Sequence, residues 1–293
     1  MKHLIDKFLT YQLSQCHSDG TVEWYRGQLY RYDSWLGSRR FDDPDTIAAY
    51  LASSRQSGNE SSTVEGHYRA LRSWFNWLHR RQLVTDNPMT AIDRPKVSKK
   101  EPKRAELDEY QLLMDLIGHA SWVDARDRLI VSLLFLCGLR RAECANLAQA
   151  DFRTKEHLLL VRDGKGGRDR LIPLPPAVNR AFVEYIFCRP MANTSAFFIA
   201  STGLGYPKPA AILPGAIYQM LRRRCQRVGL RMLNPHSFRH GLAMYLLNEG
   251  GDMSLVQRIL GHSQIATTAR YYAEWLTAGI QREYAERMRG VGE

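Results

Sequence analysis

The chain has 293 residues, with 41 basic against 30 acidic side chains and a net charge of +11. That length fits two domains of ordinary size, and 44% hydrophobic residues are enough to build their cores. The longest apolar run, residues 129–139, is too short to span a bilayer and predicts a buried helix. The charge favours a polyanionic partner such as nucleic acid, and a merely basic, solvated surface is the alternative.

The N-terminal residues and the cysteines indicate a cytoplasmic protein. Residues 1–10 mix charged and apolar side chains and lack the cleavage site of a signal peptide. The five cysteines are odd in number and show no CxxC spacing, which favours reduced thiols over a disulfide scaffold.

A change of composition divides the chain. Residues 93–104 hold two prolines and six basic residues with little to bury, which is typical of an extended linker. We therefore expect a first domain at 1–92, a basic linker at 93–104 and a second domain at 105–293. Apolar residues at helical spacing predict that the first domain is helical.

One helix of the first domain, predicted around residues 64–78, carries arginines opposite its apolar stripe. Ser62 and Glu65 match a capping box at its start. Arg69 and Arg72 on the polar face suit contacts with DNA phosphates, and a solvated charged face is the alternative.

The second domain is predicted to be helical with a small β-sheet, so the fold class is mainly α with an α+β second domain. We expect helices at 107–118, 124–137, 213–229, 236–249, 253–260 and 266–289. A hairpin is expected from strands at 157–162 and 170–174 joined by a turn at 163–167.

The chemistry of phosphodiester cleavage directs attention to basic residues. The transition state gathers charge on the non-bridging oxygens, so the site must supply fixed positive charge. A divalent metal can do so, but the sequence holds no HExxH, CxxC or DxDxDG motif. It offers instead arginines, histidines and a lysine in four short motifs.

The first motif is Gly138-Leu139-Arg140-Arg141-Ala142-Glu143. Gly138 is expected to end an apolar helix, with a new helix beginning at once. Arg140 then lies at a sharp junction, from which its planar guanidinium group can hydrogen-bond to two phosphate oxygens. Glu143, one turn on, can support it through hydrogen bonds. An ordinary surface arginine is the alternative.

The second motif is the glycine-rich turn at 163–168. Its glycines allow a tight turn that holds Lys165 at the tip of a hairpin. There the lysine can reach a DNA groove and donate a proton to a departing oxygen, and an ordinary exposed lysine is the alternative. We also expect Arg168 and Arg170 to contact DNA.

The third motif is Asn234-Pro235-His236-Ser237-Phe238-Arg239-His240. His236 and Arg239 are three residues apart and share one helix face, where an imidazole and a guanidinium can act on one phosphate. His236 and His240 also have the spacing of metal ligands, but no third ligand is evident.

The fourth motif runs from His262 to Tyr271. A tyrosine with its usual pKa of about 10 is a poor nucleophile, and most tyrosines at helix starts are structural. Nearby cations would favour the phenolate and lower that pKa. Tyr272 is adjacent and is a second candidate.

In this order the motifs resemble the tyrosine recombinase (phage integrase) family, and most of all its compact Xer-type members. The matching sequence patterns are Gly-Leu-Arg-x-x-Glu, Gly-Lys-Gly, His-x-x-Arg-His, Leu-Gly-His-Ser and Thr-Thr-x-x-Tyr. The helical first domain, ending in Asp86-Asn87-Pro88, is similar to the family's SAM-like core-binding domain. The resemblance therefore covers nearly the whole chain.

The resemblance implies a nucleophile and an acid. The Thr-Thr-x-x-Tyr spacing selects Tyr271, which would attack the scissile phosphate to give a 3′-phosphotyrosine and a free 5′-hydroxyl. Lys165 would protonate the leaving 5′-oxygen.

The resemblance also assigns the phosphate contacts. Arg140, Arg239 and His262 would bind the non-bridging oxygens, and His236 would assist proton transfer. Glu143 would support the site from behind. The phosphotyrosine stores the energy of the broken bond, so no metal or other cofactor is expected.

The implied function is site-specific recombination of double-stranded DNA through a Holliday junction, carried out by a tetramer on nucleoid DNA in the cytoplasm. Accessory DNA-bending or directionality proteins are further expected partners. The amphipathic stretch at 275–288 is expected to dock on a neighbouring subunit, and packing on its own domain is the alternative.

Three other functions stay open at this point. A type IB topoisomerase shares the chemistry, and a DNA-binding protein without catalysis shares the charge. A basic metalloprotein would use His236, His240 and His262.

Overall fold

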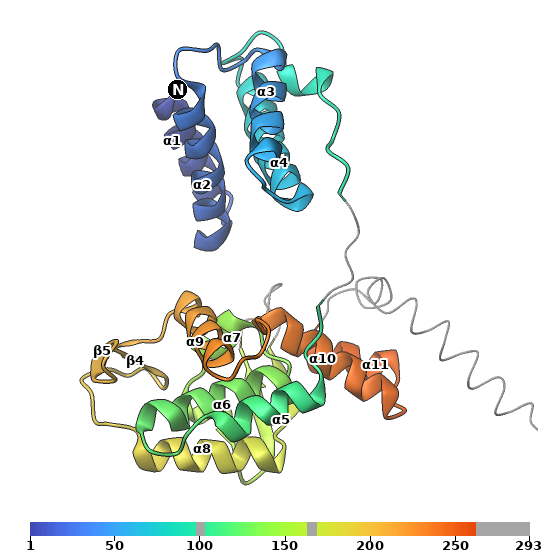
Figure 1. Ribbon diagram of the computed structural model, residues 1–293. Helices are drawn as coiled ribbons and strands as arrows, with labels where there is room; N and C mark the ends of the chain where they lie inside the picture. The colour runs from blue at the N-terminus through green and yellow to red at the C-terminus, as the bar shows by residue number, and fades with distance from the viewer. Residues whose placement is uncertain (98–102, 163–168, 262–293) are drawn as a thin grey trace, which may run out of the picture. The chain divides into compact units, whose positions relative to one another are not determined.

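The computed structural model describes residues 1–97, 103–162 and 169–261. The chain divides into two compact units, Met1–Lys100 and Glu101–Glu293, and each is described by itself (Figure 1). The turn at 163–167, the helix at 266–289 and the stretch at 275–288 lie outside the described residues.

The first unit is entirely helical in its described part. Its elements are α1 (Lys2–Ser14), α2 (Asp19–Leu36), α3 (Pro44–Gln56), α4 (Ser61–Arg80) and the short 3-10 helix η1 (Pro88–Ala91). The backbone N–H of Thr46 donates to the Asp43 carboxylate over 2.9 Å, and Pro44 occupies the first turn of α3. These local signals set where α3 begins.

Helix α4 supplies much of the core of the first unit, and Trp74 and Phe75 on it are fully buried. The capping box predicted at its start is wrong. The helix begins at Ser61, so Ser62 lies within the first turn. The Glu65 carboxylate accepts hydrogen bonds from Arg94, 2.6 Å from Nη2 and 3.1 Å from Nε. A distant arginine therefore takes the carboxylate that a capping box would need.

The second unit surrounds one apolar helix. Its elements are α5 (Leu107–Leu116), α6 (Trp122–Leu136), α7 (Arg141–Ala145), η2 (Gln149–Asp151), β1 (Phe152–Arg153), β2 (Leu158–Val161), β3 (Arg170–Pro173), α8 (Pro176–Cys188), β4 (Ile199–Ser201), β5 (Pro207–Ala211), α9 (Pro214–Arg227), α10 (Pro235–Asn248) and α11 (Met253–Leu260). Helix α6 is buried over most of its length and packs against α8 and α10.

The described strands of the second unit form two antiparallel sheets. The first has the order β1-β2-β3, and Leu159 pairs with Ile172 in the predicted hairpin. The second joins β4 and β5. The mainly helical fold with a small sheet is confirmed. Strands β1 and β4 are two and three residues long, too short for the alternation that predicts a strand.

Candidate active site

A glycine turns the chain sharply between α6 and α7. Gly138 has a φ of +60°, which side chains other than glycine rarely adopt. A Cβ at this position would lie 2.6 Å from a methyl carbon of Leu260 and 3.0 Å from one of Leu242. Helix α7 starts at Arg141, so Arg140 is its N-cap residue. The predicted junction is therefore present.

Glu143 holds Arg140 at this junction. Its carboxylate accepts hydrogen bonds from the backbone N–H of Arg140 over 2.8 Å and from Arg140 Nη1 over 2.5 Å. The Glu143 side chain is 4% exposed and that of Arg140 is 25% exposed. The expected hydrogen bonds exist, and they leave part of the Arg140 guanidinium at the surface.

Arg170 approaches the same carboxylate from β3. Its Nη1 lies 3.0 Å from Glu143 Oε1 and its Nη2 lies 2.9 Å from Oε2. Its Nε donates to the carbonyl oxygen of Ile259 over 3.0 Å, and the side chain is 10% exposed. These contacts direct the guanidinium into the unit, which does not fit the DNA contact predicted for Arg170.

The two arginines keep Glu143 charged. Burial raises the pKa of the Glu143 carboxyl, but the hydrogen bonds and charges of Arg170 and Arg140 outweigh burial and lower it to about 2. The carboxylate is therefore ionised at neutral pH, and the cluster of two guanidinium groups and one carboxylate carries a net positive charge.

Helix α10 presents the third motif. Asn234 caps it, because its Oδ1 accepts hydrogen bonds from the N–H groups of His236 and Ser237 over 2.9 and 3.0 Å. His236 reaches the surface in the first turn, and partial burial of its ring lowers its pKa. The positive charges of Arg239, Arg141 and Arg140 act in the same direction. The imidazole is therefore favoured in its neutral form, which can accept a proton.

Arg239, one turn further along α10, is buried and joins three segments. Its Nη1 donates to the carbonyl oxygen of Gly138 over 2.6 Å, and its Nη2 donates to the carbonyl oxygen of Leu260. The end of α6, helix α10 and the end of α11 therefore meet at one guanidinium.

The structure thus brings together Arg140, Glu143, His236 and Arg239 and adds Arg170 to them. Lys165, Arg168, His262 and Tyr271 lie outside the described residues. Within the described ranges, no three His, Cys, Asp or Glu side chains gather as a metal site would require. The same ranges hold no helix that is long and apolar enough to cross a membrane.

Comparison with known protein families decides the family. The sequence model of the "Phage integrase family" matches residues 103–276, and that of the "Phage integrase, N-terminal SAM-like domain" matches residues 5–82. The chain belongs to the phage integrase family. It is a tyrosine recombinase, as the motifs predicted, and the recombinase expectation is confirmed over the topoisomerase alternative.

Individual members of the family resemble the chain along most of its length. The tyrosine recombinase XerC of Alcanivorax borkumensis is 33% identical, covering 91% of this chain and 88% of its own. The tyrosine recombinase XerD of Listeria innocua is 28% identical, covering 92% and 94%. A crystal structure of lambda integrase residues 75–356, a dimer bound to a COC′ core site, has a TM-score of 0.70 at 18% identity, covering 91% and 96%. That likeness shows a shared fold.

The SAM-like domain of this integrase-family chain exposes both arginines predicted to contact DNA. Arg69 and Arg72 lie on the exposed side of α4. The Arg69 guanidinium lies 5.4 Å from the centre of the Trp24 ring and 3.7 Å from the Glu65 carboxylate. Arg69 is therefore held in place, whereas Arg72 projects from an exposed position.

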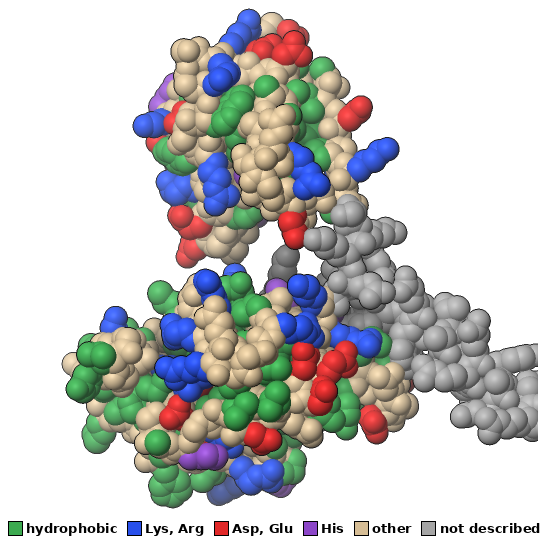
Figure 2. Space-filling model, in the orientation of Figure 1, with side chains coloured by type: hydrophobic (Ala, Val, Ile, Leu, Met, Phe, Trp, Pro, Cys, Tyr) green, Lys and Arg blue, Asp and Glu red, His purple; other side chains and the backbone are tan. Residues whose placement is uncertain are grey.

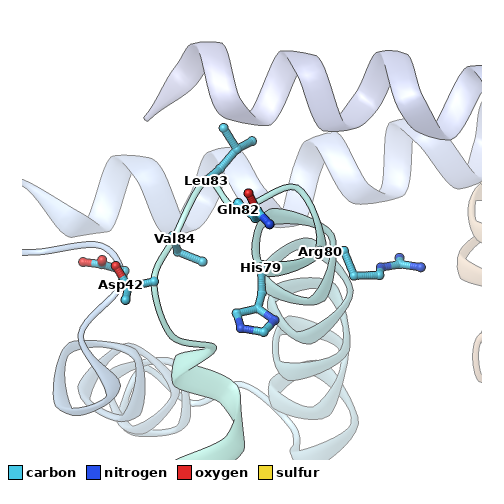
Figure 3. A pocket seen from close by; sticks show the side chains of 7 residues that line it. Asp42, His79, Arg80, Gln82, Leu83 and Val84 are labelled. Atoms are coloured by element: carbon cyan, nitrogen blue, oxygen red, sulfur yellow. The ribbon is translucent and has the colours of Figure 1, made fainter.

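A hollow in the same domain shares no residue with the cluster of Arg140, Glu143, Arg170, His236 and Arg239. It is lined by Asp42, His79, Arg80, Gln82, Leu83, Val84 and Thr85 (Figure 3). Figure 3 shows the Arg80 side chain pointing away from the hollow. Every lining residue comes from the first unit, and none belongs to the four motifs that hold the predicted site residues.

The second unit also has a basic surface that the motifs did not predict. Arg222, Arg223 and Arg227 are exposed along α9. Figure 2 shows basic side chains gathered over the end of the second unit that holds α9 and α7. The signal was present in the sequence as a run of arginines within a predicted helix.

Proposed function

We propose that this chain breaks and rejoins double-stranded DNA at a specific recombination site through a covalent bond between Tyr271 and a DNA phosphate. The observation that carries the proposal is the cluster of Arg140, Glu143, His236 and Arg239 around the ends of three helices. Arg140 and Glu143 come from one motif and His236 and Arg239 from another, far along the chain, and their joint arrangement suits one phosphate.

Arg140 is the phosphate contact with the clearest geometric support. Glu143 fixes its backbone N–H and Nη1, while a quarter of the side chain stays exposed. A guanidinium held in this way is oriented before the substrate arrives, so little reorganisation is needed as charge builds up on the phosphate oxygens. Arg239 adds a second fixed positive charge beside the same junction.

Proton transfer would be shared between three residues. As the Tyr271 oxygen bonds to phosphorus, the bond from phosphorus to the 5′-oxygen breaks. Lys165 would give a proton to that leaving oxygen. The tyrosine proton must go to a base, and the neutral imidazole favoured at His236 fits this role. Attack by a 5′-hydroxyl of a second DNA strand reverses these steps and completes the exchange through a Holliday junction.

Residues of both units would hold the DNA. Arg69 and Arg72 of α4 are candidates in the SAM-like domain, and Arg168 is one beside the catalytic lysine. The exposed arginines of α9 add positive charge to the catalytic unit. Phosphate contacts of this kind position the duplex without reading its sequence.

Recombination joins two DNA sites, so we propose that four copies of the chain assemble as a tetramer on DNA. Accessory DNA-bending or directionality proteins would assist this tetramer. It would act on nucleoid DNA in the cytoplasm. A solved structure of similar fold supports this assembly, because it is a lambda integrase tetramer bound to a Holliday junction.

Deleting residues 275–293 should weaken the pairing of two DNA sites more than it weakens binding to one site. Equal loss of both would contradict a role of this segment between subunits.

The direct test is covalent trapping on nicked DNA. The DNA that the protein binds covalently in its host is sequenced first, and a nicked duplex is built from the recovered site. The wild-type protein and Tyr272→Phe should form an adduct that survives denaturing electrophoresis. Tyr271→Phe should form none. An adduct with Tyr271→Phe would show that another residue is the nucleophile.

A further inference from the structure

Arg170 makes hydrogen bonds to Glu143 and to the end of α11, and the proposed chemistry gives it no role. All three of its nitrogens donate: Nη1 and Nη2 to the Glu143 carboxylate, and Nε to the carbonyl oxygen of Ile259. We propose that Arg170 is a positioning residue that orients Arg140 through Glu143 and fixes the end of α11. The inference rests on the proposed function, because it assigns Arg170 a part in that reaction.

The first tie completes the hydrogen bonds of Glu143. Oε1 accepts from Arg140 Nη1 and Arg170 Nη1, and Oε2 accepts from the Arg140 N–H and Arg170 Nη2. Arg170 therefore supplies two of the four bonds that hold this carboxylate in one orientation. Without them, the Arg140 guanidinium would be held by a buried carboxylate that has lost half of its donors and can rotate.

The second tie fixes the end of α11, which packs against β3. Arg170 binds the carbonyl oxygen of Ile259, and Arg239 binds that of Leu260. Cations suit this position, because the last carbonyl groups of a helix carry partial negative charge. Two consecutive carbonyl groups are thus bound by guanidinium groups from β3 and α10.

Gly261 brings the chain close enough for this contact. It ends α11 with a φ of +65°, and a Cβ there would lie 2.9 Å from Arg170 Cδ. The next residue in the sequence is His262, to which the proposed function assigns a phosphate contact. The arginine that orients Arg140 is therefore also the one against which the chain turns just before His262.

Only arginine can make this set of contacts. The three nitrogens of Arg170 belong to one planar guanidinium group, and they bind both oxygens of one carboxylate and a carbonyl oxygen. The ammonium of lysine would keep the charge, but it is a single point that cannot reach all three acceptors. Arg170→Lys thus keeps the positive charge but removes the hydrogen bonds that orient Glu143. Because Glu143 still has a positively charged neighbour, the variant should fold.

The test compares Arg170→Lys with Arg153→Gln under single-turnover conditions on the nicked duplex. Arg153 lies in the same sheet and forms an exposed ion pair with Glu156 at 3.6 Å, so it controls for loss of an Arg–Glu pair. Arg170→Lys should form the adduct about 100-fold more slowly at saturating protein, because small displacements of reacting groups cost this much. Its DNA affinity and salt dependence should equal those of the wild type. Arg153→Gln should match the wild type throughout.

The double variant Glu143→Gln/Arg170→Lys supplies a second readout. If Arg170 acts largely through Glu143, the two substitutions remove the same interaction. The double variant should then form the adduct much faster than expected from multiplying the fold-losses in rate of the two single variants. A wild-type cleavage rate for Arg170→Lys, or lower DNA affinity as its main defect, would overturn the inference while leaving the proposed function intact. No adduct from the wild-type protein would overturn the proposed function and this inference with it.

Discussion

Arg239 Nη1 donates a hydrogen bond of 2.6 Å to the carbonyl oxygen of Gly138, 101 residues earlier in the chain. This bond links two motifs of the recombinase, the one that supplies Arg140 and the one that supplies His236. The direction of the Gly138 carbonyl depends on a left-handed backbone conformation, with φ at +60°. The position of a proposed catalytic arginine thus depends on a glycine that contributes no side chain.

Gly138→Ala should lower stability and slow DNA cleavage. The new Cβ would meet Leu260 at 2.6 Å, and the positive φ adds backbone strain, so we expect a loss of about 3 kcal/mol in the free energy of unfolding. Urea denaturation measures the loss. Gly215→Ala is the matched control, because Gly215 lies in α9 with nothing within 4 Å of its Cβ position. Equal stability of the two variants would contradict this account of Gly138.

Glu143 should make the free energy of unfolding depend on pH in the acidic range. Its pKa is about 2 in the folded state against 4.5 as the ordinary value, so its contribution is fully present above about pH 4.5 and is lost as the pH falls towards 2. The shift corresponds to about 3 kcal/mol. The stability difference between the wild type and Glu143→Gln should therefore shrink from pH 6 to pH 3. Glu156→Gln, at an exposed position, is the control substitution. A difference that stays constant with pH would refute the prediction.

Asp127 should be critical for holding α9 on α6. Its Oδ1 accepts from Arg126 Nη2 over 2.8 Å, its Oδ2 accepts from Arg224 Nη2 over 2.8 Å, and its side chain is 3% exposed. Asp127→Asn leaves two buried or half-buried guanidinium groups without a carboxylate between them, which should cost about 3 kcal/mol. Thermal or urea unfolding measures the cost. The exposed Asp115 gives the control Asp115→Asn, and a similarly small effect at both positions would argue against the network.

Arg72 and Arg170 should differ in how they affect DNA binding. Arg72→Gln removes an exposed charge proposed to lie on a phosphate, so the slope of log K against log salt should fall by about one. Arg170→Lys should leave that slope unchanged, because the Arg170 guanidinium is bound inside the protein. Titrations of labelled DNA at several salt concentrations give both slopes. An unchanged slope for Arg72→Gln would remove Arg72 from the proposed DNA surface.

Local patterns predicted most of the framework of the catalytic unit. The glycine-rich turn marked the hairpin of β2 and β3, and Gly138 marked the junction of α6 and α7. Helix α8 was missed although Val178, Phe182 and Tyr185 repeat at helical spacing on its buried face. Two prolines, Pro175 and Pro176, start this helix, and prolines at a first turn are as consistent with a helix start as with a loop.

Contacts between distant residues explain why two positions differ from what the local pattern suggests. Glu65 fits a capping box by spacing, but Arg94, 29 residues away, takes its carboxylate. Arg170 follows a basic turn and was predicted to face DNA, but Glu143 and Ile259 draw its guanidinium inside. Spacing shows which residues share a local face, and it does not show which distant group will pair with a charge there.

The sequence by itself determined the family and the order of the proposed catalytic motifs, because each motif is a short run whose residue types and spacing suit the chemistry. Only the tertiary structure decided how Arg140 and Arg239 are held and that Arg170 belongs with them. The reason is physical: a guanidinium must find acceptors for its donors when it is buried, and here those acceptors come from Glu143, Gly138 and the end of α11.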